Sequence, residues 1–202
     1  MITGKRYKIA KRLGASVFEK TQGKKFALRM DTKKAGKKPR RAGSDFGLQL
    51  LEKQRARVTY GMSEKQFKNS VENILSKKTT NINEALVQEL ETRLDNTVYR
   101  LGFAPTRQAS RQMVNHGHIN VNGKRLSIPS YKVSIGDIIS IREGSQKKAL
   151  FKDLNEKFKE HKVPSWLTLD EGKREAKVQG MPKIAPNELS FDVSQIFQYY
   201  SK

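Results

Sequence analysis

The chain has 202 residues, 36% of them hydrophobic, and carries 41 Lys or Arg against 20 Asp or Glu, a net charge of +21. Such an excess destabilises a compact monomer through self-repulsion, so it predicts a polyanionic partner, and the length fits one or two domains. The sequence has no cysteine, which excludes disulfides, thiol catalysis and cysteine-based zinc sites. It also has no apolar run of about 18 residues and no signal-peptide core, so we expect a soluble intracellular protein without a membrane span.

The first 43 residues form a basic arm. Residues 1–41 hold 15 Lys or Arg and two acids, for a net charge of +13. The apolar residues of this segment keep no sustained period: Ile9, Leu13, Val17, Phe18, Phe26 and Leu28. We therefore predict an arm that packs weakly alone and orders on its partner, with a disordered solubilising tail as the alternative.

Helices are predicted from Ser44 onward. Ser44 is a candidate N-cap for a first helix that ends near Gly61 and turns four apolar residues inward: Phe46, Leu50, Leu51 and Val58. Ser63 and Gln66 have the spacing of a capping box. The helix that they open carries one apolar stripe: Phe67, Val71, Ile74 and Leu75.

A third helix is predicted from about Asn83 to Gly102, because five apolar residues share one face: Leu86, Leu90, Leu94, Val98 and Leu101. Pro105 and Thr106 open a fourth helix that ends at Gly117. Its inward residues are Ala109, Met113 and Val114.

After Gly117 the apolar period shortens to two, which predicts a small sheet. Ile119 and Val121 precede Asn122-Gly123, a pair suited to a tight hairpin turn. A second turn at Gly136-Asp137 is bracketed by apolar residues: Val133, Ile135, Ile139 and Ile141. Residues 145–162 are lysine-rich and predict an exposed helix or connector, and an aromatic helix is expected around 196–200.

The stretch from Arg93 to Arg125 carries six cations and one acid, Asp95. On the predicted helices Arg93, Thr97 and Arg100 lie opposite the leucine stripe, and Arg107 and Arg111 are neighbours one turn apart. Guanidinium groups donate bidentately to phosphate and stack on bases. We therefore predict one exposed RNA-binding surface that includes Arg93, Arg100, Arg107, Arg111, Lys124 and Arg125.

Motifs for catalysis are weak. No phosphate-binding loop and no GxSxG nucleophile elbow occur, and two close histidines without a third metal ligand, His116 and His118, predict packing or RNA contact. The sequence RLD at Arg93–Asp95 is similar to the catalytic aspartate motif of pseudouridine synthases. Asp95 is, however, expected inside a helix, and no large mixed sheet remains to hold a uridine, so we predict no enzyme and no cofactor.

These residues resemble the S-four RNA-binding module, and the resemblance extends to the family of bacterial-type small-subunit ribosomal protein S-four. The matching segments are SDFGLQLLEKQRARVTYGMSEKQF, LETRLDNTVYRLGFAPTRQASRQMVNHGHINVNGKRLSIPSYKVSIGDIISIRE, PSWL and YYSK. The central segment is the most specific. Many relatives hold zinc through four N-terminal cysteines, which this chain lacks, so we expect its arm to fold without metal or to be ordered by RNA.

The resemblance implies an α+β fold in which a mostly helical first domain receives an inserted S-four module of two helices and a small antiparallel sheet. The implied domains are a basic arm at 1–43, a helical ribosomal RNA-binding domain at 44–91 completed by a C-terminal helix at 185–202, and the module with its extension at 92–184. The first domain adds further expected RNA-binding residues: Lys53, Arg55, Arg57, Lys65 and Lys68.

The family implies a structural constituent of the small ribosomal subunit, in a bacterial cytoplasm or a plastid stroma. It binds small-subunit ribosomal RNA early in assembly, at a junction of the 5′ domain. A basic loop of such relatives lines the channel where mRNA enters, next to ribosomal protein S-three; the matching residues are Lys37, Lys38, Arg40 and Arg41. The C-terminal region meets ribosomal protein S-five and affects decoding accuracy, and the expected contact residues are Phe197, Tyr199 and Tyr200. No membrane partner and no homo-oligomer are expected.

Two other functions remain open from the sequence. The same module occurs in free RNA-binding regulators or chaperones, and in RNA-modifying enzymes of the pseudouridine synthase type.

Overall fold

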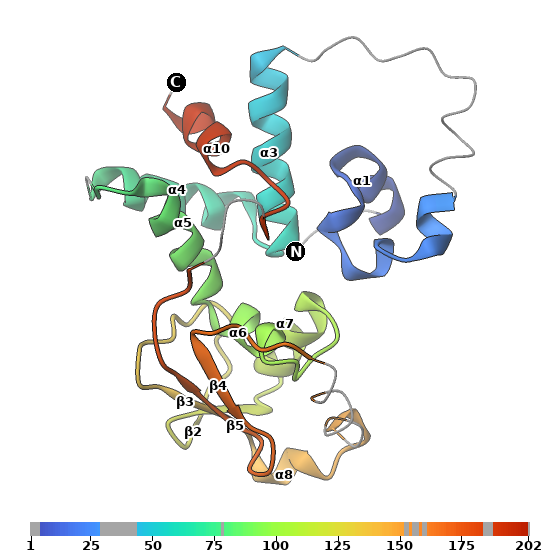
Figure 1. The fold of residues 1–202 in the computed structure, drawn as a ribbon, viewed down its shortest axis with the longest axis vertical. Coiled ribbons are helices and arrows are strands. Elements are labelled where there is room, and N and C mark those ends of the chain that lie inside the picture. Colours follow the sequence, from blue (N-terminus) through green and yellow to red (C-terminus); the bar gives the residue numbers. More distant parts are fainter. Residues whose placement is uncertain are drawn as a thin grey trace. The chain divides into compact units, whose positions relative to one another are not determined.

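A computed structural model of the chain describes residues 5–28, 44–77, 79–151, 154, 158, 161–183 and 188–201. The chain divides into two compact units (Figure 1). The first comprises Met1–Leu86 and Ile184–Lys202, and the second comprises Val87–Lys183. In the described residues both units contain helices, and the second unit also contains an antiparallel sheet. This confirms the predicted α+β class.

The first unit begins with α1 (Arg6–Leu13) and two short 3-10 helices (Ala15–Val17 and Glu19–Thr21). Five apolar side chains of this segment form a buried cluster with Val58 of α3: Ala10, Leu13, Val17, Phe18 and Phe26. The segment thus packs on a neighbouring helix although its sequence has no regular period. Its ordering on a partner stays a prediction.

The helical part of the first unit comprises α3 (Asp45–Thr59), α4 (Glu64–Ser76), the start of α5 (Ile82–Glu91) and α10 (Val193–Tyr200). Ser44 caps α3 through a hydrogen bond from the Gly47 amide. The predicted capping box of α4 is present, because the Gln66 amide donates to Ser63 Oγ and the Ser63 amide donates to Gln66 Oε1.

The predicted inward faces of α3 and α4 differ in how well they match the structure. In α4, Phe67, Val71 and Ile74 are buried as expected. In α3, Val58 is buried but Phe46 is 52% exposed, so the inward placement of Phe46 was wrong. Phe46 lies in the first turn of α3, and its ring contacts that of Tyr199 with centroids 5.5 Å apart. A residue at a helix end has neighbours on fewer sides than one in the middle, so periodicity alone overestimates its burial.

The long third helix predicted from 83 to 101 is two helices, α5 and α6 (Leu94–Arg100). Arg93 is extended and forms an isolated antiparallel bridge with Lys132. The Leu94 amide donates to the Tyr131 carbonyl and the Val133 amide donates to the Thr92 carbonyl, at 2.7 and 2.8 Å. Residues 129–133 therefore form hydrogen bonds with backbone groups that would be bonded within the helix if it were continuous. The leucine stripe hides this break because Leu90 and Leu94 are both fully buried.

The second unit continues with α7 (Arg107–Asn115), β1 (Ile119–Val121), β2 (Lys124–Arg125), β3 (Ile138–Ile141), α8 (Glu143–Gln146), a 3-10 turn (Ala149–Phe151), β4 (Leu167–Asp170) and β5 (Glu175–Val178). Thr106 caps α7, and Asn122 and Gly123 both have positive φ in the predicted hairpin turn. The strand order is β2-β1-β3-β5-β4, and every neighbouring pair is antiparallel.

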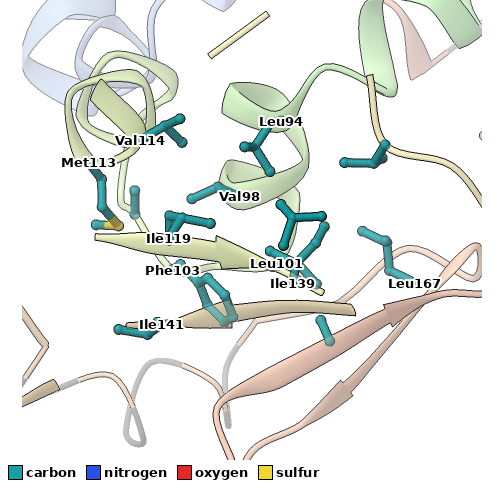
Figure 2. Packing of buried hydrophobic residues seen from close by; sticks show 14 of the residues in the cluster. Leu94, Val98, Leu101, Phe103, Met113, Val114, Ile119, Ile139, Ile141 and Leu167 are labelled. Carbon is teal, nitrogen blue, oxygen red and sulfur yellow. The ribbon is translucent and has the colours of Figure 1, made fainter. Parts of the chain in front are cut away.

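A single apolar core joins α6 and α7 to one face of this sheet (Figure 2). Alternate strand residues such as Ile119, Ile139 and Ile141 are buried in one cluster with Leu94 and Val98 of α6. This alternation is what a half-buried antiparallel strand requires. Ile135, which precedes the second turn, is 59% exposed.

The expectation of an exposed helix or connector at 145–162 was wrong for three of its residues. Phe151, Leu154 and Phe158 are at most 3% exposed and belong to the core cluster. Their spacing of three and four residues is a helical stripe, which the surrounding lysines hide. The β4–β5 hairpin was also missed, although Leu167 and Leu169 alternate with polar residues before the turn.

The burial of Phe151 predicts a large effect on stability. Phe151→Ala should lower the free energy of unfolding by about 3–5 kcal/mol, because it removes a fully buried ring. Leu150→Ala is the matched control, since Leu150 is 51% exposed, and it should change stability by only about 0.5 kcal/mol. Urea denaturation followed by the fluorescence of Trp166, a core residue of the same unit, measures both. Equal effects of the two variants would contradict the packing of this segment.

Candidate nucleic-acid interface

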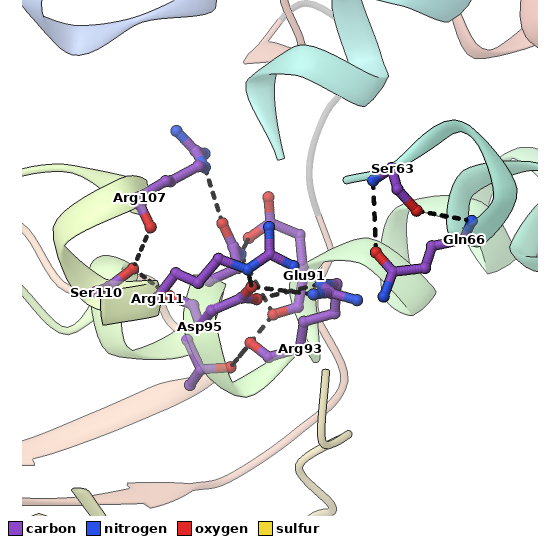
Figure 3. A network of polar contacts seen from close by, with 10 residues as sticks. Ser63, Gln66, Glu91, Arg93, Asp95, Arg107, Ser110 and Arg111 are labelled. Atoms are coloured by element: carbon purple, nitrogen blue, oxygen red, sulfur yellow. Dashed lines mark hydrogen bonds and ion pairs between the residues drawn. The ribbon is translucent and has the colours of Figure 1, made fainter. Parts of the chain in front are cut away.

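Four arginines of the second unit come together as the sequence predicts, but they surround two carboxylates (Figure 3). We call Arg93, Arg100, Arg107 and Arg111, together with Glu91, Asp95 and Asn96, the arginine cluster. The count of six cations and one acid in 93–125 therefore understates the acids at this surface, because Glu91 lies just before that stretch. Among the described residues, four guanidinium groups against two carboxylates still leave a local excess of positive charge.

Glu91 forms the first half of the arginine cluster. Its residue is fully buried, and its two carboxylate oxygens accept hydrogen bonds from Nε and Nη2 of Arg100 at 2.8 and 2.7 Å. The Asn96 amide nitrogen donates to the same carboxylate at 2.6 Å. A buried carboxylate is stable only when it is paired and hydrogen-bonded, and Glu91 meets both conditions. The side chain of Arg100 remains 29% exposed.

Asp95 forms the second half. Arg93 donates to it bidentately at 3.1 and 2.9 Å, and Arg111 Nε lies 3.4 Å from its Oδ2 atom. Arg93 is only 5% exposed, so its predicted place on an exposed surface was wrong, and its role in this structure is to pair with Asp95. Arg111 keeps 28% of its side chain exposed. Burial lowers the pKa of Arg111, while Asp95 opposes this shift, and arginine stays protonated in proteins regardless.

Arg107 is held by an amide and a ring. Its Nε donates to Asn96 Oδ1 at 2.9 Å, and its guanidinium lies 4.4 Å from the centre of the Tyr99 ring. Because Asn96 also donates to Glu91, this amide connects the orientation of Arg107 to that of the buried carboxylate.

The break between α5 and α6 determines this arrangement. Thr97, expected to face outward, is fully buried and donates to the Arg93 carbonyl at 3.0 Å. Sequence reasoning missed Glu91, because it lies nine positions before Arg100 and a continuous helix would place the two on opposite faces. It also missed Asn96, which lies one helical turn before Arg100. The available signal was the glutamate shortly before the RLD sequence. It could not be interpreted as a partner of Arg100 without knowing that the helix breaks between α5 and α6.

Lys124 and Arg125 lie on β2 and are exposed, as predicted. Arg125 Nη2 donates to the His116 carbonyl at 3.5 Å. Its guanidinium occupies the space where a side chain at Gly117 would lie, and Gly117 has a φ of +67°. Glycine is therefore required at 117 both by the backbone and by the arginine.

His118 lies in a positively charged environment. Its Nδ1 atom is 2.9 Å from Ser145 Oγ. Burial lowers the pKa of His118, and nearby basic groups lower it further: Lys148, His116, Arg125 and Arg142. His118 is therefore expected to be neutral at neutral pH. Within the residues that the structure describes, no group of three His, Asp or Glu side chains could hold a metal ion.

The predicted RNA-binding cations of the first unit are mostly paired within the chain. Lys53 is 5% exposed, pairs with Glu64 and lies 4.6 Å from the Tyr199 ring centre, so its predicted exposure to RNA was wrong. Arg57 also pairs with Glu64, at 3.2 Å.

The remaining cations of this set differ in their contacts. Arg55 donates to the Leu13 carbonyl at 2.6 Å and pairs with Glu52. Lys65 is exposed, and Lys68 is exposed and pairs with Glu72 at 3.5 Å. Lys65 and Lys68 are therefore the two predicted contacts on the surface of α4.

One of the three aromatic residues expected to contact a partner, Phe197 of α10, differs from its expected role. Phe197 is 4% exposed, so it packs within the first unit and does not present a surface to a partner. Tyr199 and Tyr200 are partly buried, and the Tyr200 hydroxyl donates to Glu64 at 3.3 Å. Burial, followed by the charge of Glu64 and this hydrogen bond, raises the pKa of Tyr200.

The predicted mRNA-channel residues lie outside the described residues: Lys37, Lys38, Arg40 and Arg41. In the described part of the chain, no helix is both long enough and apolar enough to cross a bilayer.

Comparison with known families gives two matches that together cover residues 1–139. The Ribosomal protein S4/S9 N-terminal domain matches residues 1–91, and the S4 domain, the S-four module of the sequence, matches residues 92–139. The second match begins at the break between α5 and α6 and includes most of the arginine cluster.

Individual relatives match over nearly the whole chain. The protein named small ribosomal subunit protein uS4 from Herpetosiphon aurantiacus is 41% identical over 99% of this chain and 98% of its own length. The uS4 of Brevibacillus brevis is 41% identical over the same shares, and that of a Sulfurihydrogenibium species is 42% identical over 96% of this chain and 95% of its own. The chain belongs to the ribosomal protein S4 family, a family of structural and non-enzymatic proteins.

Proposed function

We propose that this protein is a structural constituent of the small ribosomal subunit and that it binds small-subunit ribosomal RNA. The observation that carries the proposal is the match to uS4 proteins over at least 96% of the chain, which includes both the N-terminal domain and the S4 domain. A protein that shared only the RNA-binding module, such as a free regulator, would match over the module alone.

The charge of the chain supports this proposal. A net charge of +21 on 202 residues favours a polyanion. The deep and narrow major groove of A-form RNA is closed to side chains, so folded RNA is recognised by its shape, its phosphates and its 2′-hydroxyl groups. Partly exposed guanidinium groups on rigid helices, such as those of Arg100, Arg107 and Arg111, suit phosphates in fixed positions.

The finer role follows the family resemblance. We infer that the protein binds early in assembly, at a helical junction of the 5′ domain of the RNA. The basic run Lys37, Lys38, Arg40 and Arg41 has the charge to line the mRNA channel where messenger enters. The partly buried rings of Tyr199 and Tyr200 are the residues of α10 that remain for a contact with ribosomal protein S5, through which decoding accuracy is affected.

The alternative of a pseudouridine synthase is not supported by the geometry of Asp95. Its residue is 4% exposed, and Arg93 and Arg111 occupy its carboxylate. A catalytic aspartate needs access to the uridine, whereas the carboxylate of Asp95 is buried and paired with two arginines.

The most direct prediction concerns the ribosome. The tagged protein should co-sediment with small subunits through a high-salt wash, because the RNA that surrounds a structural constituent retains it even though salt weakens each phosphate contact. A free regulator should be released under the same conditions. Sucrose-gradient fractions probed for the tag distinguish the two, and recovery only at the top of the gradient would refute the proposal.

A second prediction uses the exposed hairpin. Lys124→Glu with Arg125→Glu should weaken binding to small-subunit ribosomal RNA. Because two cations would no longer neutralise phosphates, the salt dependence of affinity should fall by about 1.4–1.8 log units per log unit of salt. Lys173→Glu with Lys177→Glu is the control, because both lysines are exposed in the same unit and make the same charge change. The control should keep the wild-type salt dependence. Equal effects of the two pairs would mean that only total charge matters.

A further inference from the structure

The four arginines of the arginine cluster are held by the same kind of contact. In each of them the Nε atom points to a buried partner in the cluster: Asp95 for Arg93 and Arg111, Glu91 for Arg100, and Asn96 for Arg107. An arginine that served only as a dispersed positive charge would not need its Nε atom held in this way. This common Nε contact indicates that the buried partners determine where the guanidinium groups point.

These buried partners are themselves fixed. Glu91, Asp95 and Asn96 are at most 4% exposed and lie at or beside the break between α5 and α6. Backbone bonds from 129–133 hold this break, including one from the Asp95 amide to the Pro129 carbonyl at 3.1 Å. Ser110 Oγ of α7 donates to the Asp95 carbonyl at 2.5 Å, which ties the second helix of the module to the same point.

We propose that Glu91 and Asp95, with Asn96 as a relay, are positioning residues for RNA binding. They hold Arg100, Arg107 and Arg111 in the orientation that meets ribosomal RNA phosphates, so that little side-chain freedom is lost when the RNA binds. Arg93 completes the arrangement by neutralising Asp95 from the buried side. This inference rests on the proposed function, because it concerns how the same chain grips ribosomal RNA.

The inference makes a prediction opposite in sign to that of simple electrostatics. Replacing a carboxylate by a neutral amide raises the net positive charge of the protein, and charge alone would then strengthen its binding to a polyanion. If the carboxylate positions an arginine, the same replacement weakens binding.

The chain offers a matched pair of variants for this test. Glu91 and Glu89 both lie on α5, and each pairs with a cation. The partner of Glu89 is Lys132, whose side chain is 57% exposed and stands outside the arginine cluster. Glu91→Gln and Glu89→Gln therefore make the same chemical change two residues apart.

Affinity for small-subunit ribosomal RNA should fall about tenfold in Glu91→Gln, the size expected for one lost charge-assisted hydrogen bond. Glu89→Gln should bind as tightly as the wild type or more tightly. Binding is measured by filter retention at several salt concentrations, below the thermal unfolding temperature of each variant as followed by circular dichroism. Equal or tighter binding by folded Glu91→Gln would overturn the inference and indicate that the carboxylates merely neutralise the arginines.

A double-mutant cycle decides the question if Glu91→Gln does not fold. Asn96→Ala should weaken RNA binding in the wild type, but the double variant with Arg107→Ala should bind within about twofold of Arg107→Ala alone, because coupled residues give non-additive effects. Effects that multiply would show that Asn96 does not act through Arg107, which would overturn the relay.

The two proposals fail in different ways. If the wild type does not prefer small-subunit ribosomal RNA over large-subunit RNA of similar length, the proposed function fails and the inference falls with it. If the wild type binds as proposed while Glu91→Gln and Glu89→Gln behave alike, only the positioning role fails.

Discussion

The ion pairs of two buried carboxylates, Glu91 and Asp95, are the interactions on which the second unit and its candidate interface depend. Burying a carboxylate is costly, and removing the partner of a buried ion pair typically destabilises a protein by about 3–5 kcal/mol. Each carboxylate here lies where the backbone leaves one helix and enters the next, and each is held by the fork of an arginine. The fold at the break and the orientation of the arginines therefore have the same physical origin.

The first unit places its cations in a different way. Lys53 and Arg57 share Glu64, and Lys53 also lies against the Tyr199 ring, so these charges hold α3, α4 and α10 together. The predicted RNA contacts on α4, Lys65 and Lys68, remain at the surface. Some basic residues of this chain therefore hold helices together and others remain at the surface for RNA. Only the contacts of each side chain show to which group it belongs. A surface count of Lys and Arg overestimates the number available to RNA.

The sequence was sufficient for features that depend on neighbours in the chain. Ser63 and Gln66 predicted the capping box, and Asn122-Gly123 predicted the hairpin, because caps and tight turns are determined within four residues. Features that depend on distant segments were missed. The break at Arg93 needs the segment at 129–133, and the burial of Phe151 needs the core that it joins. The prediction that the four arginines lie together was correct. The prediction that Arg93 is exposed was wrong, because the apolar periodicity indicated one helix where the structure has α5 and α6.

The central claim is that preorganised arginines of the S4 domain meet ribosomal RNA phosphates. The most direct measurement is a high-resolution electron cryo-microscopy map of the small subunit from the organism that makes this protein. The account predicts Arg100, Arg107 and Arg111 within hydrogen-bonding distance of phosphate oxygens while Glu91, Asp95 and Asn96 still hold their Nε atoms. A map in which these guanidinium groups face solvent or another protein, or have left their acidic partners to reach the RNA, would contradict it.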